Sequence, residues 1–249
     1  MTWEWDQITI DDYLREPAIK KLRVLLACEE SQAVTIELRK LGHEAYSCDI
    51  QECSGGHPEW HITQDVLPLL NGNCEFMSMD GQRHTIEGKW DMIIAFPPCT
   101  YLSNAGACRL YPKKGELDMD RFKKGLEAKE FFLKFLNADC PRVAVENPVS
   151  SNVFKMPVHT QEIQPYQFDP DGEHPWTKKT RLWIRGDLKP LVPTSPNAVP
   201  LGPYVPSVTG RKDRSKYGAA RRGEDSKNRA KTFIGIARAM AEQWGGKCI

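Results

Sequence analysis

The sequence lacks the features that define several classes of protein. Its 249 residues carry a formal net charge of only +1, so overall charge provides no attraction to nucleic acid or membrane. No apolar run approaches the length of a membrane span, and the first ten residues, MTWEWDQITI, contain no apolar leader. Eight cysteines are scattered without a C-x-x-C pair, which favours reduced thiols. We therefore expect a cytoplasmic, monomeric chain that does not contact membranes.

The length and the 40% hydrophobic composition suit one sizeable core with an insertion. We expect one core over residues 1–157 and a closing helix within 226–249 that packs back on it. The insertion between them, 158–225, has six prolines between Pro190 and Pro206, which is typical of an extended surface segment. A basic run follows, from Arg211 to Lys231, with nine Lys or Arg against three acids.

The first regular pattern predicts a strand followed by a helix. The run LRVLLACEES, from Leu22 to Ser31, is short, apolar and continuous, as in a strand buried on both faces. Ser31 is suited to cap the next helix, and Gly42 is suited to close it. Helical spacing places three apolar residues on one face of that helix: Val34, Leu38 and Leu41.

Strand and helix patterns then alternate along the chain. Further strands are predicted within 43–50, 61–70, 90–96, 141–148 and 178–186. A helix is predicted over 118–137 with a buried face of Phe122, Leu126, Leu133 and Leu136, and the last helix has Phe233, Ala237, Met240 and Trp244 on one face. This order predicts an α/β fold with a mostly parallel sheet and helices on both faces.

The predicted strand ends carry many chemically active side chains. In an open parallel sheet, residues beyond the carboxyl ends of the strands converge on one crevice. Here they are Cys28, Glu29, Glu30, Asp49, Asp65, Cys99, Glu146 and Asn147. Strand ends are often polar simply because they reach water, so each residue needs a chemical argument of its own.

Cys99 has the most specific setting among these residues. It follows Pro97 and Pro98 at the end of an apolar strand, and two prolines stiffen the turn that carries the next side chain outward. A partly exposed thiol near positive charge is a nucleophile. Glu146 ends the next predicted strand, where partial burial would raise its pKa and let it donate a proton. Asn147 is predicted to orient Glu146 or to bind a substrate edge.

The pieces PPC, at Pro97 to Cys99, and ENP, at Glu146 to Pro148, resemble the DNA cytosine-5 methyltransferase family. The resemblance covers most of the chain in outline, and the short length is similar to phage-encoded members. It implies a Rossmann-like S-adenosylmethionine-dependent methyltransferase fold with the catalytic core over residues 1–157. It implies that Cys99 adds to C6 of cytosine while Glu146 protonates N3. The methyl group for C5 would come from S-adenosylmethionine, and the substrate would be DNA.

The resemblance also implies binding residues. Asp49 stands where the family places an acid on the cofactor ribose, and Asp65 where an Asp contacts the adenine amino group. The full predicted cofactor set is Cys28, Glu29, Glu30, Ser31, Asp49, Ile50, Asp65, Val66 and Pro97. The predicted substrate set is Pro98, Thr100, Lys178, Arg181, Arg211, Arg214, Arg221 and Arg222. Lys178 and Arg181 stand where the family uses basic residues to hold the flipped base.

Three features depart from the family pattern. The glycine-rich loop after the first strand is replaced by ACEESQ, in which Glu29 or Glu30 could meet the ammonium and sulfonium of the cofactor. The chain has ENP and PCT where the family usually has ENV and PCQ. The region from about 150 to 225 is short for a target-recognition domain, so we expect sequence specificity to be weak or to be supplied by a protein partner.

Other functions are compatible with the same residues. An amino-methyltransferase normally has an acid or Asn, two prolines and an aromatic residue, whereas Phe96 and Cys99 occupy the two ends of that pattern here. A zinc site could use the loosely spaced Cys48, Cys53, His57 and His61, although our primary prediction includes no metal. A catalytically inactive DNA-binding or decoy protein, and an enzyme acting on single strands or free nucleotides, also remain open.

Overall fold

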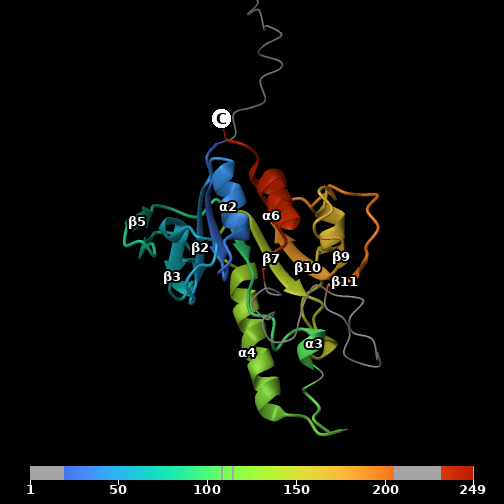
Figure 1. Ribbon diagram of the computed structural model, residues 1–249. Helices are drawn as coiled ribbons and strands as arrows, with labels where there is room; N and C mark the ends of the chain where they lie inside the picture. The colour runs from blue at the N-terminus through green and yellow to red at the C-terminus, as the bar shows by residue number, and fades with distance from the viewer. Residues whose placement is uncertain (1–19, 108, 114, 205–230, 249) are drawn as a thin grey trace, which may run out of the picture.

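The computed structural model describes residues 20–107, 109–113, 115–204 and 231–248, and its centre is a seven-stranded sheet (Figure 1). The strand order is β3-β2-β1-β6-β7-β10-β8, in which the first five strands are mutually parallel and the last two pair antiparallel. Their bounds are β1 Arg23–Ala27, β2 Glu44–Asp49, β3 His61–Thr63, β6 Met92–Ala95, β7 Val143–Pro148, β8 Gln161–Ile163 and β10 Thr180–Arg185. The predicted α/β fold with a mostly parallel sheet is confirmed, and it is compatible with a Rossmann-like fold.

Helices cover both faces of the sheet, as predicted. On one face, Val24 and Leu26 pack with α2 (Ala33–Lys40) and α6 (Ile234–Met240), which lie side by side (Figure 1). On the other face, Leu25 and Ala27 share a core with α4 (Met119–Leu136). Successive residues of a strand point to opposite faces, so the continuous apolar run of β1 supplies both cores.

The closing helix packs back on the core as predicted. Ala237 and Met240 of α6 are fully buried, and Trp244 in the following π turn, η5 (Ala241–Gly245), is 5% exposed. Phe233 lies at the N-cap of α6 and is half-buried. The end of the chain is therefore fixed to the same core that contains β1.

The helix predicted over 118–137 is α4, but its buried face differs from the prediction. Asp118 caps it by accepting a hydrogen bond from Arg121 N at 2.9 Å. Leu126 was expected in the core and is 41% exposed, whereas Phe132 and Phe135 are fully buried. The buried face of α4 is shifted because the helix packs closely against the Phe154 ring at Gly125. Gly125 has no side chain that would hold the helix away from this ring.

Helix α2 begins differently from the prediction. The Ser31 side chain does not cap it, because Gln32 is the N-cap residue, with a φ of 58°, and makes no side-chain cap. Instead, the Glu29 carboxylate accepts hydrogen bonds from Val34 N at 2.6 Å and from the Thr35 hydroxyl at 2.6 Å. Burial raises the pKa of Glu29 to about 7, although these hydrogen bonds oppose the shift. The Glu29 carboxylate therefore caps the start of α2, in place of the Ser31 hydroxyl that was predicted to cap it.

Several short elements had no clear sequence signal. A hairpin of β4 (Cys74–Met77) and β5 (Arg83–Ile86) projects from the sheet, and β8 extends the sheet at its far edge (Figure 1). The proline-rich segment contributes only β11 (Gly202–Pro203), paired with β9 (Trp176–Thr177), to the regular structure of the described residues 187–204. The remaining short helices are η1 Pro58–Trp60, η2 Leu67–Leu69, α3 Asn104–Ala107, η3 Asn152–Phe154 and η4 Pro165–Phe168.

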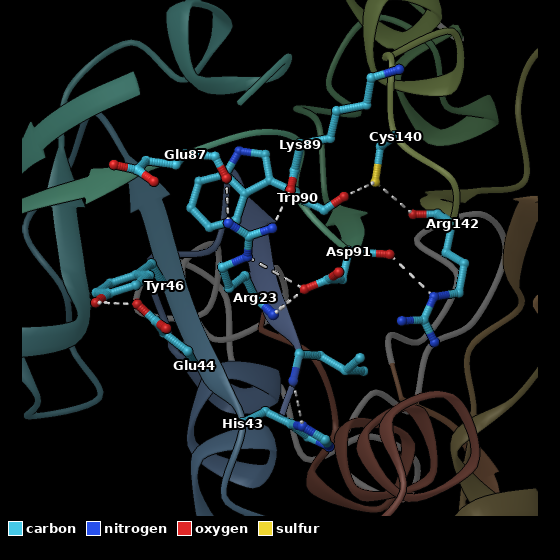
Figure 2. A network of polar contacts seen from close by, with 11 residues as sticks. Arg23, His43, Glu44, Tyr46, Glu87, Lys89, Trp90, Asp91, Cys140 and Arg142 are labelled. Atoms are coloured by element: carbon cyan, nitrogen blue, oxygen red, sulfur yellow. Dashed lines mark hydrogen bonds and ion pairs between the residues drawn. The ribbon is translucent and has the colours of Figure 1, made fainter. Parts of the chain in front are cut away.

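The amino-terminal edge of the sheet is tied together by a polar network (Figure 2). Arg23 N donates to Asp91 Oδ2 at 2.8 Å, and Arg142 Nε donates to Asp91 O at 3.1 Å, which joins the starts of β1, β6 and β7. Cys140 Sγ donates to Trp90 O at 3.3 Å. A surface hollow at this edge, lined in part by Arg23 and Asp91, lies opposite the edge that holds the predicted site.

Within the part of the chain that the structure describes, no helix combines the length and the apolar character needed to cross a membrane.

Candidate active site

The sheet has a topological switch point between β1 and β6. The chain proceeds from β1 outward through β2 to β3, and β6 then returns to the other side of β1. Connections leave the sheet in opposite directions at such a point, and open parallel sheets usually bind ligands beyond the carboxyl ends of the two strands. Cys28 follows β1 and Pro97 follows β6, so the predicted cofactor and nucleophile residues lie at this point of the sheet.

A tight turn holds Cys99 at the exit of β6. Phe96 N donates to Ala27 O at 2.8 Å, which keeps the strand paired up to the prolines. The Cys99 carbonyl then accepts hydrogen bonds from Leu102 N at 3.1 Å and Ser103 N at 2.9 Å. Cys99 is half-buried, Pro97 is buried, and Pro98 and Thr100 are exposed. The thiol is therefore partly accessible on a fixed backbone.

Glu146 and Lys178 act electrostatically on Cys99. Burial raises the pKa of the Cys99 thiol, the charge of Glu146 raises it further, and the charge of Lys178 lowers it. Burial also raises the pKa of Glu146, while Lys178 and a hydrogen bond from Thr180 lower it. The structure thus brings the predicted nucleophile, acid and cation together. Thr180, which is 6% exposed, was not predicted to belong to this group.

Asn147 and Arg181 lie on the other face of the sheet. Antiparallel register places Glu146 opposite Leu182, and Asn147 opposite Arg181. Neighbouring residues of a strand point to opposite faces, so Asn147 points away from the Glu146 side. Neither side-chain polar atom of the fully buried Asn147 has a hydrogen-bond partner within the described residues, so it does not orient Glu146 through a hydrogen bond.

Arg181 has a partner unrelated to Cys99. Its Nε lies 3.5 Å from Glu162 Oε2, on the neighbouring strand β8. Lys179 Nζ contacts the other oxygen of the same carboxylate at 2.9 Å. Of the two basic residues predicted to hold the flipped base, only Lys178 acts electrostatically on Cys99 and Glu146 among the described residues.

The loop after Cys99 is anchored by α4, a feature that the sequence did not reveal. Arg121 donates to Gly106 O at 3.0 Å, and its guanidinium lies 5.0 Å from the centre of the Tyr101 ring. Ser103 forms a β-bridge with Ser150, two residues after β7. These contacts connect the loop that follows the candidate nucleophile to the segment that follows the candidate acid.

The ends of β1, β2 and β3 form the predicted cofactor side. Asp49 and Asp65 both raise the pKa of the half-buried Cys28 thiol, so the three side chains lie near one another. Asp49 Oδ1 accepts from Gln51 N at 2.9 Å and Asp65 Oδ1 from Leu67 N at 3.0 Å. Among the described residues, the second oxygen of each carboxylate has no hydrogen-bond partner. The carboxylates are therefore oriented by the backbone and still able to accept from a ligand.

Other predicted cofactor residues differ in accessibility. Ile50 is 78% exposed beside Asp49, which leaves an apolar side chain on the surface of this edge. Val66 is only 4% exposed and belongs to the core, so its side chain does not line that surface. Glu29 is occupied by the cap of α2. Glu30 and Ser31 are half-buried, and the Glu30 side chain has no hydrogen bond or ion pair within the described residues.

The alternative zinc site is not assembled. Cys48 Sγ donates to Gln64 O, and the His61 ring nitrogens contact Ser47 Oγ and Gln51 O. The His57 ring stacks on Trp60 with centroids 3.9 Å apart. Within the described residues, which include all four proposed ligands, no group of three or more His, Cys, Asp or Glu is placed to hold a metal ion.

Four predicted phosphate-binding residues, Arg211, Arg214, Arg221 and Arg222, lie outside the described residues, as does most of the basic run. The predictions for these residues therefore stay untested. Comparison with models of protein families gives no match, and no curated protein sequence matches this chain.

Proposed function

We propose that this protein is a DNA cytosine-C5 methyltransferase that uses S-adenosylmethionine. The observation that carries the proposal is the meeting of Cys99, Glu146 and Lys178 at the exits of β6 and β7. A thiol nucleophile beside a carboxylic acid of raised pKa is the pair that activates a pyrimidine ring at C5. The acid protonates the ring nitrogen, which makes C6 electrophilic enough for the sulfur to add.

Each residue has a defined part in this reaction. The Cys99 thiolate forms a bond to C6 as N3 takes a proton from Glu146, and C5 becomes nucleophilic. After C5 has accepted a methyl group, it loses its proton to water, the bond between sulfur and C6 breaks to release the Cys99 thiolate, and N3 returns its proton to Glu146. Lys178 favours the thiolate because its positive charge lowers the pKa of Cys99.

The residues at the ends of β1 to β3 fit the proposed cofactor. Asp49 and Asp65 each keep a carboxylate oxygen for hydroxyl or amino donors of an adenosine, and Ile50 offers an apolar contact for its base. Glu30 is available for the ammonium or sulfonium group, whereas Glu29 is not. When bound, S-adenosylmethionine would supply a methyl group on a positively charged sulfur, which is an electrophile for C5.

The proposal is tested by trapping the covalent adduct. The protein is incubated with labelled S-adenosylmethionine and DNA containing 5-fluorocytosine, in which C5 has no proton to lose, so elimination is blocked. We expect a labelled protein–DNA adduct that survives denaturation. It should disappear in Cys99→Ala and remain in Cys140→Ala, a control that removes a buried thiol at the opposite edge of the sheet.

Substrate class is tested in the same assay with duplex DNA, single-stranded DNA and a free deoxycytidine nucleotide. A duplex requires extrusion of the target base, which costs a few kcal/mol, so weak adduct formation on duplex and strong formation on a single strand would restrict the substrate to unpaired cytosine. If the protein binds DNA but neither binds S-adenosylmethionine in calorimetry nor forms an adduct, the non-catalytic DNA-binding function replaces the proposed one.

A further inference from the structure

An aromatic cluster lies beside Lys178. The Lys178 ammonium is 5.3 Å from the centre of the Phe233 ring. Two further rings pack edge-on against Phe233, those of Tyr204 at 4.9 Å and of His174 at 5.2 Å between ring centres. The three rings come from three separate segments of the chain, and all are half-buried.

The backbone fixes this cluster next to Lys178. Tyr204 N donates to Thr177 O at 3.0 Å, immediately before Lys178 in the sequence, and His174 N donates to Asp169 Oδ2 at 2.8 Å. Phe233 is the N-cap residue of α6, whose Ala237 and Met240 are fully buried in the core. The Phe233 ring is therefore held both by its neighbours and by a helix docked on the sheet.

The Lys178 side chain needs contacts that hold its ammonium in one position. Its side chain has four rotatable bonds, and the effect of its charge on a thiol falls with distance. The face of an aromatic ring attracts an ammonium group electrostatically, which favours one position of the flexible side chain. We propose that Phe233, held by Tyr204 and His174, is a positioning residue that keeps the Lys178 ammonium next to the Cys99–Glu146 pair.

Among the described residues, two charged side chains act on Cys99. Glu146 acts on it from β7 and Lys178 from the segment before β10, with opposite signs. Thr180 hydrogen-bonds Glu146, and the titratable groups in contact with Phe233 are Lys178, His174 and Tyr204. Displacement of the ammonium should therefore leave the unfavourable effect of Glu146 unopposed and make the thiol harder to ionise.

The test measures ionisation of Cys99 in the protein alone. The thiolate displaces iodide from iodoacetamide, and the rate of alkylation of the Cys99 peptide is followed by mass spectrometry from pH 6 to 10. We expect Lys178→Met to slow alkylation about tenfold at neutral pH. Phe233→Leu should slow it about two- to fivefold, and Phe233→Tyr, which keeps the ring, should restore the rate.

Matched controls separate this effect on Cys99 ionisation from a general loss of packing in the protein. Lys179→Met removes the neighbouring lysine, which pairs with Glu162, and Phe131→Leu removes a half-buried ring on α4. Both should alkylate at the wild-type rate. If Phe233→Leu unfolds, Tyr204→Leu leaves α6 intact and is expected to change the rate in the same direction.

The positioning role is overturned if Phe233→Leu and Tyr204→Leu both alkylate like wild type, or if Lys178→Met does. The inference rests on the proposed function only in treating Cys99 as the nucleophile, and the assay needs neither DNA nor a methyl donor. The expected pattern without any methyltransferase activity would therefore support the inference and refute the proposed function. The reverse result would refute the inference alone.

Discussion

At the scale of single residues, Asn147 is the least satisfied group of the described structure. It is fully buried, and both its amide nitrogen and its amide oxygen lack a hydrogen-bond partner among the described residues. An unsatisfied buried amide costs about 1 to 3 kcal/mol of stability. Asn147 directly follows the candidate acid but points to the opposite face of the sheet, so this stability cost is separate from the Cys99–Glu146 pair.

Asn147→Leu tests this interpretation, since leucine has the same branching without polar atoms. We expect the free energy of unfolding in urea to rise by about 1 to 2 kcal/mol while adduct formation with 5-fluorocytosine DNA stays at the wild-type level. Asn152→Leu, at an exposed position in η3, is the control and should change neither quantity. A less stable Asn147→Leu protein would mean that the amide is already bound in the free protein.

Glu146→Gln should change the two reactions of Cys99 in opposite directions. The carboxylate raises the pKa of Cys99, so its removal should lower that pKa and speed alkylation by iodoacetamide several-fold near neutral pH. The amide cannot protonate N3, so adduct formation with DNA should be lost. Both rates are measured on the same preparation, and parallel changes in the two would contradict the assigned acid role. Glu162→Gln, which removes an acid paired with Lys179, is the control.

At the scale of elements, helix starts and helix packing depend on contacts that are distant in sequence or unusual in type. The start of α2 depends on Glu29, which reaches over its first turn to accept from Val34 N and the Thr35 hydroxyl. The position of α4 depends on Phe154, which packs against Gly125 and stacks on Phe122 with ring centres 5.9 Å apart. Phe154 belongs to η3, shortly after β7, so α4 is fixed relative to the strand that carries Glu146.

Gly125→Ala should destabilise the protein even though alanine favours helices. The added Cβ would lie 2.1 Å from Phe154 Cζ, and the ring is only 2% exposed, so it has little room to move. Overpacking of this kind costs about 1 to 3 kcal/mol, more than the helix propensity gained. Urea unfolding measures the effect. Phe154→Leu in the same chain should recover part of the loss, and the absence of any recovery would place the strain elsewhere.

At the scale of the whole molecule, the two edges of the sheet carry different kinds of side chain. The Arg23–Asp91–Arg142 network joins the strand starts at the amino-terminal edge. The carboxyl-terminal edge carries carboxylates, a thiol and an exposed isoleucine. The contacts that join the strand starts and the candidate site are thereby placed at opposite ends of the same strands. Glu29 differs from the other acids at the carboxyl-terminal edge, because it is buried and its carboxylate caps α2.

Glu29 gives the stability of the whole protein a definite pH dependence. Its pKa is about 7 in the folded protein and near 4.5 when unfolded, so the folded state binds the additional proton between these values. The free energy of unfolding should therefore fall as pH rises from about 4.5 to 7, and Glu146, whose pKa is also raised, acts with the same sign. The acids of lowered pKa, Glu162 and Asp80, lose their contributions below this window as pH falls.

Glu29→Gln should flatten this dependence. Urea unfolding at pH 5, 6 and 7 measures the slope for wild type, Glu29→Gln and the control Glu30→Gln. We expect the control to keep the wild-type slope. A Glu29→Gln protein with an unchanged slope would show that Glu29 does not titrate in this window.

Local patterns predicted much of the fold and the identities of the central site residues. Continuous apolar runs fixed β1, β6 and β7, helical periodicity fixed α4 and α6, and the two prolines marked the exit at Cys99. The hairpin β4–β5 and strand β8 were missed because they are short and half-exposed, with little apolar contrast. Ser31 was misassigned as a cap because serine is a usual cap residue, while a carboxylate five residues before Val34 is not.

The sequence by itself determined the order of strands and helices and the residue types at the strand exits, because these depend on local periodicity and on proline geometry. Only the tertiary structure decided which exits meet. The switch point beside β1, the antiparallel return of β10 and the docking of α6 bring Lys178, Thr180 and Phe233 to the Cys99–Glu146 pair. Lys178, Thr180 and Phe233 lie from about 30 to 130 positions away from that pair in the sequence. Their proximity follows from strand pairing and core packing, which act between distant parts of the chain.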